Sequence, residues 1–374
     1  MATRKNEASW IESRERWQIN VQSDGERRTF SSSIAGKKGK IAAEKKADAW
    51  LEKKLVNSST KAFRILDDWG EALKASTSWS HYRQQRNYID NWIKPVIGHK
   101  KIGSVTKRDL QDIIDRAYKL GNSGNGMAEK TLKNIRSCIS SFFKYCRSIP
   151  CTTLFPEGLT IPRGAKPSEK TIATKDDLRV LFSTSTSKWR EKPIEDPFIH
   201  AYRFMVVTGL RPGELVGLER TNIRNGRMTI THSINQYEER TNGKNANSRR
   251  TQQLSETALQ ILADQRAMLM HLGMVSKYVF PDKDGDYITQ QNFRRAWKRY
   301  CAANGISGAN TPYEMRHTFV SVVDEMPTLL KKMVVGHSKN MDTEGIYGHQ
   351  KAGDMERAAA YIDAAFRDIL STEN

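Results

Sequence analysis

Cysteines are scarce in this sequence, with only Cys138, Cys146, Cys151 and Cys301 among its 374 residues. None of them forms a C-x-x-C pair, and none stands near a histidine at a spacing typical of zinc ligands. This pattern disfavours a disulfide framework or a structural zinc site, and it is typical of reduced thiols in a reducing compartment. We therefore expect no metal site.

Long apolar runs and acidic residues are also in short supply. No stretch approaches the roughly 20 apolar residues that cross a bilayer, and the N-terminus lacks the apolar segment of a signal peptide. Lysine and arginine number 61 against 42 acidic residues, which gives a net charge of +19. Such an excess indicates a polyanionic partner, most simply nucleic acid, with an anionic membrane surface as the competing interpretation. We expect a soluble cytoplasmic protein without a membrane anchor.

Three motifs in the second half of the chain carry side chains suited to chemistry at phosphorus. They read Thr-Gly-Leu-Arg-Pro-Gly-Glu-Leu at 208–215, Thr-Pro-Tyr-Glu-Met-Arg-His-Thr at 311–318 and Val-Gly-His-Ser at 335–338, and Tyr347 follows. An arginine offers a planar fork for phosphate oxygens, a histidine can donate or accept a proton, and a tyrosine hydroxyl can attack. Taken singly, each has an ordinary structural interpretation. Taken together, in this order, they favour covalent catalysis on a phosphodiester.

In these motifs the sequence resembles the tyrosine recombinase (phage integrase) family. The family's boxes read T-G-L-R-x-G-E-L, then H-x-L-R-H-T, then L-G-H-S with a tyrosine ten residues after that histidine, which is the spacing from His337 to Tyr347. Two positions depart from the pattern. Tyr313 stands where the family usually has the first histidine, and Met315 replaces a leucine.

The resemblance implies a catalytic role for each matching residue. Tyr347 would attack the scissile phosphate and form a 3′-phosphotyrosyl bond, while Arg211 and Arg316 hold the non-bridging oxygens and His337 assists. A stretch from Gly243 resembles the family's β-hairpin K-T-x-x-S-x-R. By that match Lys244 would protonate the departing 5′-oxygen. Because the covalent link keeps the phosphodiester energy and the arginines supply positive charge, no cofactor is expected.

Two further residues in the motifs are assigned supporting parts. Glu214, three residues after Arg211, is well placed to orient that arginine. Tyr313 would stay neutral near neutral pH, so its hydroxyl would act as a positioning donor and not as a proton shuttle. The competing interpretation makes Tyr313 the nucleophile and leaves Tyr347 as a packing residue.

Hydrophobic periodicity and turn signals predict a multidomain, mainly α protein with small β elements. Residues 1–57 read as a small sheet followed by a basic loop at 35–40 and a helix, and they resemble the family's arm-type DNA-binding domain. Residues 62–155 predict a four-helix core-binding domain, with Thr106 and Asp109 capping its third helix and the second ending before Pro95. Proline-rich residues 148–170 read as a linker, and 171–374 as a mixed α+β catalytic domain. An amphipathic helix at 352–370 is expected to pack on a neighbouring protomer, with packing on its own domain as the competing interpretation.

Clusters of basic residues are the candidate DNA contacts outside the catalytic set. An ordinary solvated surface is the competing interpretation for each of them. The candidates are Arg27, Arg28, Lys37, Lys38, Lys100, Lys101, Lys107, Arg249, Arg250, Arg294 and Arg295.

The resemblance implies a site-specific recombinase that integrates and excises a phage or an integrative or conjugative element. Its partners would be double-stranded attachment-site DNA, three sister protomers in a homotetramer assembled on DNA, and possible DNA-bending or directionality proteins, at the nucleoid of a bacterium. A type IB-like topoisomerase and a non-catalytic DNA-binding protein of the same fold remain as alternatives. The intact set Arg211, Arg316, His337 and Tyr347 argues against the second alternative.

Overall fold

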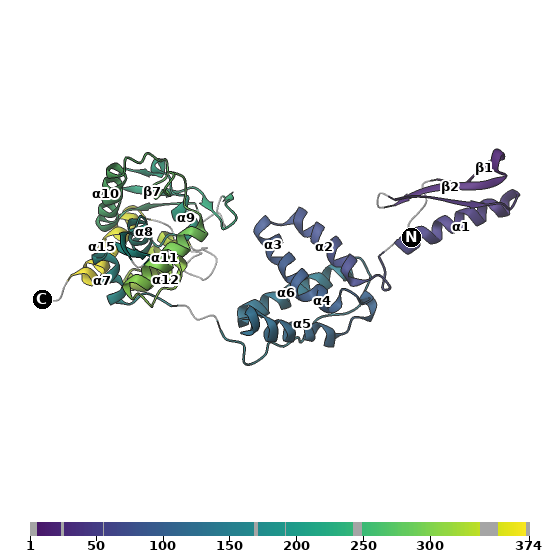
Figure 1. The fold of residues 1–374 in the computed structure, drawn as a ribbon, viewed down its shortest axis with the longest axis horizontal. Helices are drawn as coiled ribbons and strands as arrows, with labels where there is room; N and C mark the ends of the chain where they lie inside the picture. Colours follow the sequence, from purple (N-terminus) through teal and green to yellow (C-terminus); the bar gives the residue numbers. More distant parts are fainter. Residues whose placement is uncertain are drawn as a thin grey trace. The chain divides into compact units, whose positions relative to one another are not determined.

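The computed structural model describes residues 6–23, 26–54, 56–167, 171–190, 192–241, 249–336 and 351–371. Contacts divide the chain into two units, Met1–Ser168 and Glu169–Asn374. The first unit contains two separate hydrophobic clusters, and the second contains one large cluster. Helices predominate and the sheets are small, so the predicted fold class is confirmed (Figure 1). In the described ranges, no helix combines the length and the apolar character that membrane crossing requires.

A three-stranded antiparallel sheet and one helix form the first cluster. The strands are β1 Ser9–Ile11, β2 Arg16–Ser23 and β3 Glu26–Ser32, in the order β1-β2-β3, and the helix is α1 Gly36–Lys54. Ile19 of the sheet packs with Ala47 and Trp50 of the helix. The prediction of a basic loop at 35–40 is wrong for 36–40, because those residues open α1. Gly39 allows this early start, since a Cβ there would lie 1.6 Å from the carbonyl oxygen of Ile34.

The second cluster is a bundle of helices. Its members are α2 Ala62–Ser76, α3 Trp79–Tyr88, α4 Lys94–Ile97, α5 Lys107–Leu120 and α6 Glu129–Ser148, with a π-helical stretch at Ile89–Ile93. The capping box of Thr106 and Asp109 is present as predicted. The second helix was expected to end before Pro95, but helical structure continues to Ile97. Pro95 is tolerated because it falls in the first turn of α4, where a missing N–H costs least.

Residues 149–167, predicted as part of a linker, instead pack on this bundle. Cys151, Leu159 and Ala165 are buried in its hydrophobic cluster. Side chains of the helices also hold the segment's backbone: Arg136 donates to the Leu159 carbonyl at 3.1 Å, and Gln111 accepts from the Thr160 N–H at 3.0 Å. The folded part that contains the helical bundle therefore extends beyond the boundary expected at residue 155. Proline content alone did not predict that these partners would fix the segment.

The second unit combines a three-stranded antiparallel sheet with a larger set of helices. The sheet has the order β10-β7-β6, from β6 Ile223–Arg224, β7 Arg227–Ile230 and β10 Arg250–Gln253. Two small hairpins pair β4 Thr186–Trp189 with β5 Lys192–Glu195, and β8 Ser233–Ile234 with β9 Arg240–Thr241. The helices are α7 Lys175–Ser183, α8 Ile199–Thr208, α9 Pro212–Val216, α10 Glu256–His271, α11 Gln290–Asn304, α12 Pro312–Val322, α13 Thr328–Val335 and α15 Asp354–Leu370.

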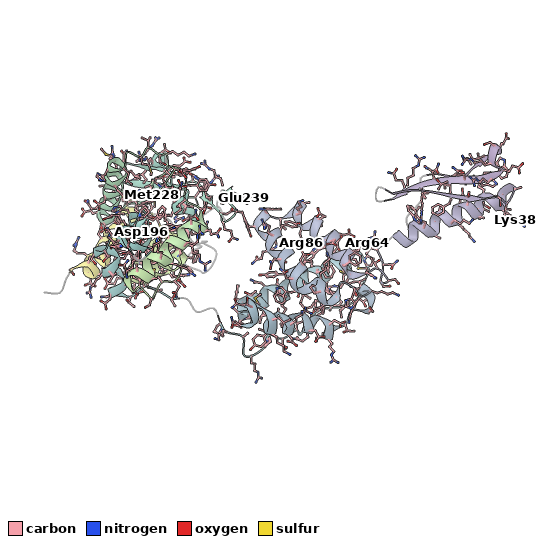
Figure 2. All side chains as sticks on the ribbon, in the orientation of Figure 1. Lys38, Arg64, Arg86, Asp196, Met228 and Glu239 are labelled. Carbon is pink, nitrogen blue, oxygen red and sulfur yellow. The ribbon has the colours of Figure 1, made fainter. Side chains whose placement is uncertain are left out.

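Helix α8 lies at the centre of this unit and is buried along nearly its whole length. Tyr202 on α8 meets Trp297 of α11, with ring centroids 5.0 Å apart, and α8 also packs against α10 and α12. The sheet adds Met228, whose side chain lies in the same core (Figure 2). Because α8 is fixed from several sides, the residues that directly follow it are held in a defined position.

The apolar stripe of α15 is covered by its own unit, so the packing expected on a neighbouring protomer is not needed to bury it. Ile362, Phe366 and Ile369 belong to the unit's core, and α15 contacts α7, α10, α13 and β10. Asp363 on the same helix accepts hydrogen bonds from the backbone N–H groups of Glu256 and Thr257 at the start of α10. The stripe therefore stabilises a single copy of the chain.

Replacing Phe366 with alanine should destabilise this unit, because the side chain is fully buried beside Phe182. We expect the free energy of unfolding to fall by about 3 to 5 kcal/mol, measured by urea denaturation followed by circular dichroism. The exposed Arg367→Ala variant on the same helix is the control and should change it by less than about 0.5 kcal/mol. Normal stability combined with loss of self-association would instead assign the stripe to a protomer interface.

Candidate active site

Two predicted catalytic arginines are brought together by elements far apart in the sequence. Helix α8 ends at Thr208, and Gly209 turns the chain with a φ of +65° toward Arg211 at the start of α9. A Cβ on Gly209 would lie 2.5 Å from the Phe319 ring of α12, so only glycine allows this close approach. Arg316 projects from α12 and donates to the Gly209 carbonyl at 2.8 Å.

Glu214 is a buried carboxylate that holds Arg211, as its position three residues later suggested. Its side chain is 3% exposed, and one oxygen accepts from Nη1 of Arg211 at 2.7 Å. The other oxygen accepts from the Arg211 backbone N–H at 3.0 Å, which closes a capping box on α9. The Arg211 side chain keeps 28% of its surface exposed.

Arg250 was predicted to contact phosphate, but the structure turns it inward onto the same carboxylate. Its Nη1 and Nη2 donate to the two oxygens of Glu214 at 3.1 and 3.0 Å, and its Nε donates to the Val334 carbonyl at 2.7 Å. Only 7% of the side chain is exposed. Burial alone would raise the pKa of Glu214, but the hydrogen bonds and charge of Arg250, with those of Arg211, outweigh it and lower the pKa. Glu214 is therefore a carboxylate at neutral pH.

Arg316 is also enclosed, with 2% of its surface exposed. Besides the Gly209 carbonyl, it donates through Nη2 to the Val335 carbonyl at 2.6 Å. Burial lowers the pKa of Arg316 to about 10, and the charge of Arg211 acts in the same direction. The guanidinium nevertheless stays protonated at neutral pH, so it adds a fixed positive charge to the site.

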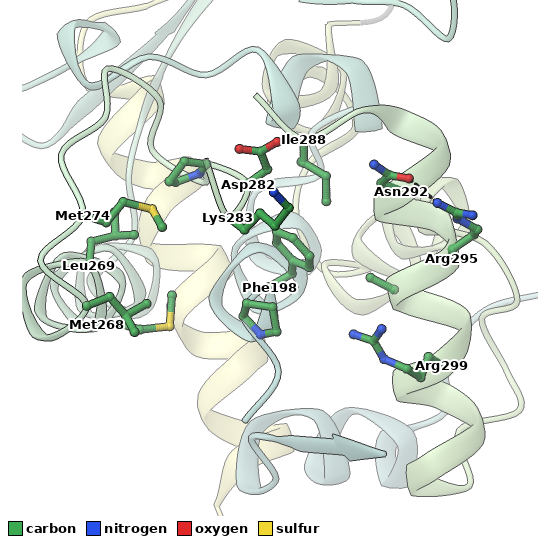
Figure 3. A pocket seen from close by; sticks show the side chains of 14 residues that line it. Phe198, Met268, Leu269, Met274, Asp282, Lys283, Ile288, Asn292, Arg295 and Arg299 are labelled. Atoms are coloured by element: carbon green, nitrogen blue, oxygen red, sulfur yellow. Dashed lines mark hydrogen bonds between the residues drawn. The ribbon is translucent and has the colours of Figure 1, made fainter. Parts of the chain in front are cut away.

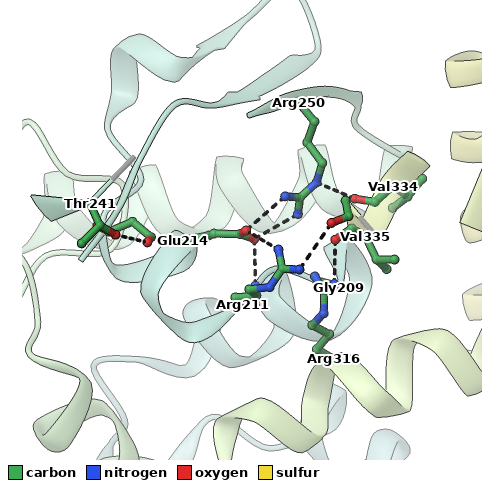
Figure 4. Close-up of polar contacts among 10 residues, drawn as sticks. Gly209, Arg211, Glu214, Thr241, Arg250, Arg316, Val334 and Val335 are labelled. Atoms are coloured by element: carbon green, nitrogen blue, oxygen red, sulfur yellow. Dashed lines mark hydrogen bonds and ion pairs between the residues drawn. The ribbon is translucent and has the colours of Figure 1, made fainter. Parts of the chain in front are cut away.

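The end of α13 is the common target of these arginines. Its last carbonyls accept in succession: Val334 from Arg250, Val335 from Arg316, and Gly336 from Nη2 of Arg211 at 3.4 Å (Figure 4). Carbonyls at a helix C-terminus lack intrahelical partners and carry the negative end of the helix dipole, so guanidinium groups satisfy them well. The sequence did not predict this arrangement, because no motif marks which backbone carbonyls will face an arginine.

A hollow of about 430 Å³ opens beside Arg211, and several predicted residues meet there. Its lining includes Arg211, Ser233, Gln290, Arg294 and Tyr313. Tyr313 is 46% exposed, and its ring meets that of His317 edge-on at 5.2 Å. The structure thus places the tyrosine that replaces the family's histidine at the same hollow as the first arginine.

Three of the six predicted catalytic residues, Lys244, His337 and Tyr347, lie outside the described residues. Gly336, the last described residue before His337, is held by Arg211. In the parts of the chain that are described, no three His, Cys, Asp or Glu side chains cluster as metal ligands would.

Most of the predicted DNA-contacting residues are at the surface. The exposed ones are Arg27, Arg28, Lys37, Lys38 (labelled in Figure 2), Lys101, Lys107, Arg249, Arg294 and Arg295. Lys100 differs, because its ammonium pairs with the Asp109 carboxylate that caps α5. Arg295 donates to the side chain of Asn292 at 2.6 Å.

A larger hollow of about 820 Å³ lies elsewhere in this unit, between α10 and α11 (Figure 3). Apolar side chains such as Phe198, Met268 and Ile288 form much of its wall, and Arg295 and Arg299 stand along α11. Arg299 approaches the buried Asp196 carboxylate at 3.8 Å. None of the three described catalytic candidates, Arg211, Tyr313 and Arg316, lines this hollow.

Comparison with known proteins finds matches to both units. The Phage integrase family profile matches residues 173–353, and the profile for the N-terminal SAM-like domain of phage integrases matches residues 64–118. A tyrosine recombinase XerC-like protein of Caldanaerobacter subterraneus subsp. tengcongensis is 26% identical over 74% of this chain and 74% of its own.

Two solved structures share the fold at low sequence identity. The Tn1549 transposon integrase in complex with a circular intermediate DNA has a TM-score of 0.62 at 18% identity, covering 81% of this chain and 99% of its own. A lambda integrase tetramer bound to a Holliday junction has a TM-score of 0.61 at 14% identity, covering 94% and 99%. The second match extends over nearly the full length of both chains.

Replacing Glu214 with glutamine should lower the free energy of unfolding by about 3 to 5 kcal/mol, as expected when a buried ion pair loses one partner. The effect should depend on pH. Because the folded pKa lies below the ordinary value of 4.5, the carboxylate stabilises the fold fully above 4.5 and loses this contribution as the pH falls through the folded value. Urea unfolding at neutral and acid pH measures both quantities.

The control for this variant is Glu314→Gln, which alters an acid that caps α12 by accepting from the Thr311 N–H at 2.6 Å. We expect a loss of only about 1 kcal/mol there. Equal losses in the two variants, or an unchanged acid dependence in Glu214→Gln, would contradict the buried ion-pair assignment.

Proposed function

The chain belongs to the phage integrase family of tyrosine recombinases, and we propose that it cleaves and rejoins attachment-site DNA through a 3′-phosphotyrosyl intermediate. The observation that carries this proposal is the meeting of Arg211 and Arg316 at the end of α13. Two fixed guanidinium charges there suit the non-bridging oxygens of a phosphate, and the chain continues directly into the segment that contains His337 and Tyr347.

The proposed reaction keeps the number of phosphoester bonds constant. The Tyr347 hydroxyl attacks the scissile phosphorus, a tyrosyl phosphoester forms, and the bond to the 5′-oxygen breaks. Arg211 and Arg316 stabilise the charge on the non-bridging oxygens, His337 assists by accepting the proton of the attacking hydroxyl, and Lys244 gives a proton to the departing 5′-oxygen. The hydroxyl of Tyr313 supplies one neutral hydrogen bond at the hollow. Reversal of these steps with a different 5′-hydroxyl joins new partners.

We further assign each part of the chain a task in this reaction. Residues 1–57 bind distal arm sites, residues 62–155 bind the core site, and residues 171–374 catalyse cleavage. Exposed lysines and arginines on the first part, such as Arg27, Arg28 and Lys38, suit phosphate contacts. The lambda relative was solved as a tetramer on a Holliday junction, and we propose a tetramer on DNA here as well, serving integration and excision of a mobile element.

The Tyr347→Phe variant should bind DNA but form no covalent adduct, because the ring remains while the nucleophile is lost. The probe is a nicked duplex built from the element's ends, identified by sequencing the DNA that flanks the gene. An adduct that survives boiling in detergent reports cleavage. Persistence of the adduct in this variant would rule out Tyr347 as the nucleophile.

Tyr313→Phe is the matched control, since it removes the other candidate hydroxyl in the same way. We expect its cleavage to be slower by roughly tenfold, the effect of one neutral hydrogen bond of about 1 kcal/mol. Peptide mapping of the wild-type adduct completes the test. A DNA-linked peptide that contains Tyr313 would reverse the two assignments.

Deleting residues 1–57 should leave cleavage of a core site intact and abolish protection of distal arm sites. The separate hydrophobic cluster of the sheet and α1 is the physical reason. None of the buried residues of the other two clusters lies in 1–57, and only the partly buried Val56 packs against one of them. Footprinting of the full-length and shortened proteins on the same DNA measures the difference. An unchanged footprint outside the core would contradict arm binding by this part.

A further inference from the structure

Arg250 has no part in the reaction described above, yet it is held more completely than a surface arginine would be. Three of its nitrogens donate to protein acceptors, two to Glu214 and one to the Val334 carbonyl. Its backbone is also fixed, because it is the first residue of β10 and pairs with Ile230 of β7. Such an arginine serves the protein and not the DNA backbone.

We propose that Arg250 is a positioning residue that keeps the charge of Arg211 available to the scissile phosphate and holds the end of α13 against the sheet. This inference rests on the proposed function, since it concerns the same phosphate. It adds a residue that contacts neither the DNA nor the reacting atoms. Arg250 acts indirectly, through its hydrogen bonds to the Glu214 carboxylate and to the Val334 carbonyl of α13.

The first part of the argument concerns charge. Arg211 and Arg316 contribute two positive charges, and Glu214 beside Arg211 contributes one negative charge. Without Arg250, the carboxylate would offset half of the charge that these two arginines present to a phosphate. Arg250 adds a third positive charge beside Glu214, so the group of four keeps a net charge of about +2. Arg211 can then be oriented by Glu214 without being neutralised by it.

The second part concerns geometry. Arg250 joins β10 to the Val334 carbonyl, Arg316 joins α12 to the Val335 carbonyl, and Arg211 joins α9 to the Gly336 carbonyl. Contacts between α13 and β10 accompany the first of these links. Loss of Arg250 would remove the hydrogen bond that joins the end of α13 to β10, while the hydrogen bonds to Arg316 and Arg211 remain. A shift of that end would displace both arginines, because they share its adjacent carbonyls.

The test compares Arg250→Met, Arg250→Lys and the double variant Arg250→Met/Glu214→Gln with wild type, using the full chain and the nicked duplex described above. Arg203→Met is the matched control, because Arg203 is also a partly buried arginine that donates to backbone carbonyls, those of Leu181 and Thr184, away from the arginine pair. All proteins are assayed at a temperature at which thermal unfolding shows them to be folded. DNA affinity and the single-turnover rate of adduct formation are measured separately.

We expect Arg250→Met to form the adduct roughly 10- to 100-fold more slowly with DNA affinity changed less than about twofold, the range seen when a supporting partner of a functional group is lost. The double variant should be faster than Arg250→Met, because the uncompensated carboxylate is gone. Arg250→Lys should be intermediate, since lysine restores the charge but not the fork. Arg203→Met should lose stability but keep its cleavage rate.

The outcomes separate this inference from the proposed function. Absence of an adduct with wild-type protein overturns the proposed function itself. A wild-type protein that forms the adduct, with Arg250→Met equally fast, overturns only the positioning role. The same conclusion follows if the double variant is slower than Arg250→Met, or if Arg203→Met loses as much rate. Should Arg250→Met fail to fold, an Arg250→Lys variant as fast as wild type overturns the role.

Discussion

One buried carboxylate, that of Glu214, ties together the parts of the candidate active site. It is nearly inaccessible to water, and a charge in that position is tolerated only when opposite charges and hydrogen bonds compensate it. Arg211 supplies this compensation from α9 and Arg250 from β10, and both arginines also reach the end of α13. The requirement to satisfy a single ion therefore brings a turn, a strand and a helix end into one fixed arrangement.

Local chemistry explains which parts of the fold could be predicted from the sequence. The capping boxes of Thr106 with Asp109 and of Thr174 with Asp177 are complete within four residues, so the starts of α5 and α7 could be read directly. The early start of α1 could not, because it depends on Gly39 passing the Ile34 carbonyl. The position of residues 149–167 could not be predicted either, because it depends on contacts with Arg136 and Gln111, which lie on helices earlier in the chain.

In the candidate site, too, the contact between residues close in the sequence could be predicted, and the contact between distant residues could not. The pairing of Arg211 with Glu214 was predictable because the two residues stand three apart at the start of a helix. Arg250 lies 36 residues from Glu214, and it follows a stretch that resembles the family's β-hairpin, where it was expected to contact phosphate. A basic residue at the start of a strand can face either DNA or a buried carboxylate, and only the packed structure distinguishes these two environments. The apolar stripe of α15 presented the same ambiguity between a neighbouring protomer and its own core.

Arg211, Arg250 and Arg316 all donate hydrogen bonds to backbone carbonyls, and these bonds prepare the site for a phosphate. Carbonyls at a helix end are partial negative charges with fixed directions, so they orient each guanidinium before any substrate binds. Arg316 remains charged despite its burial, and Arg211 keeps an exposed edge at the hollow beside Tyr313. Stabilisation of a developing charge is largest when the donors need no reorganisation during the reaction. The enclosure of the arginines is therefore compatible with their proposed role, because their orientation is set by the fold and not by the phosphate.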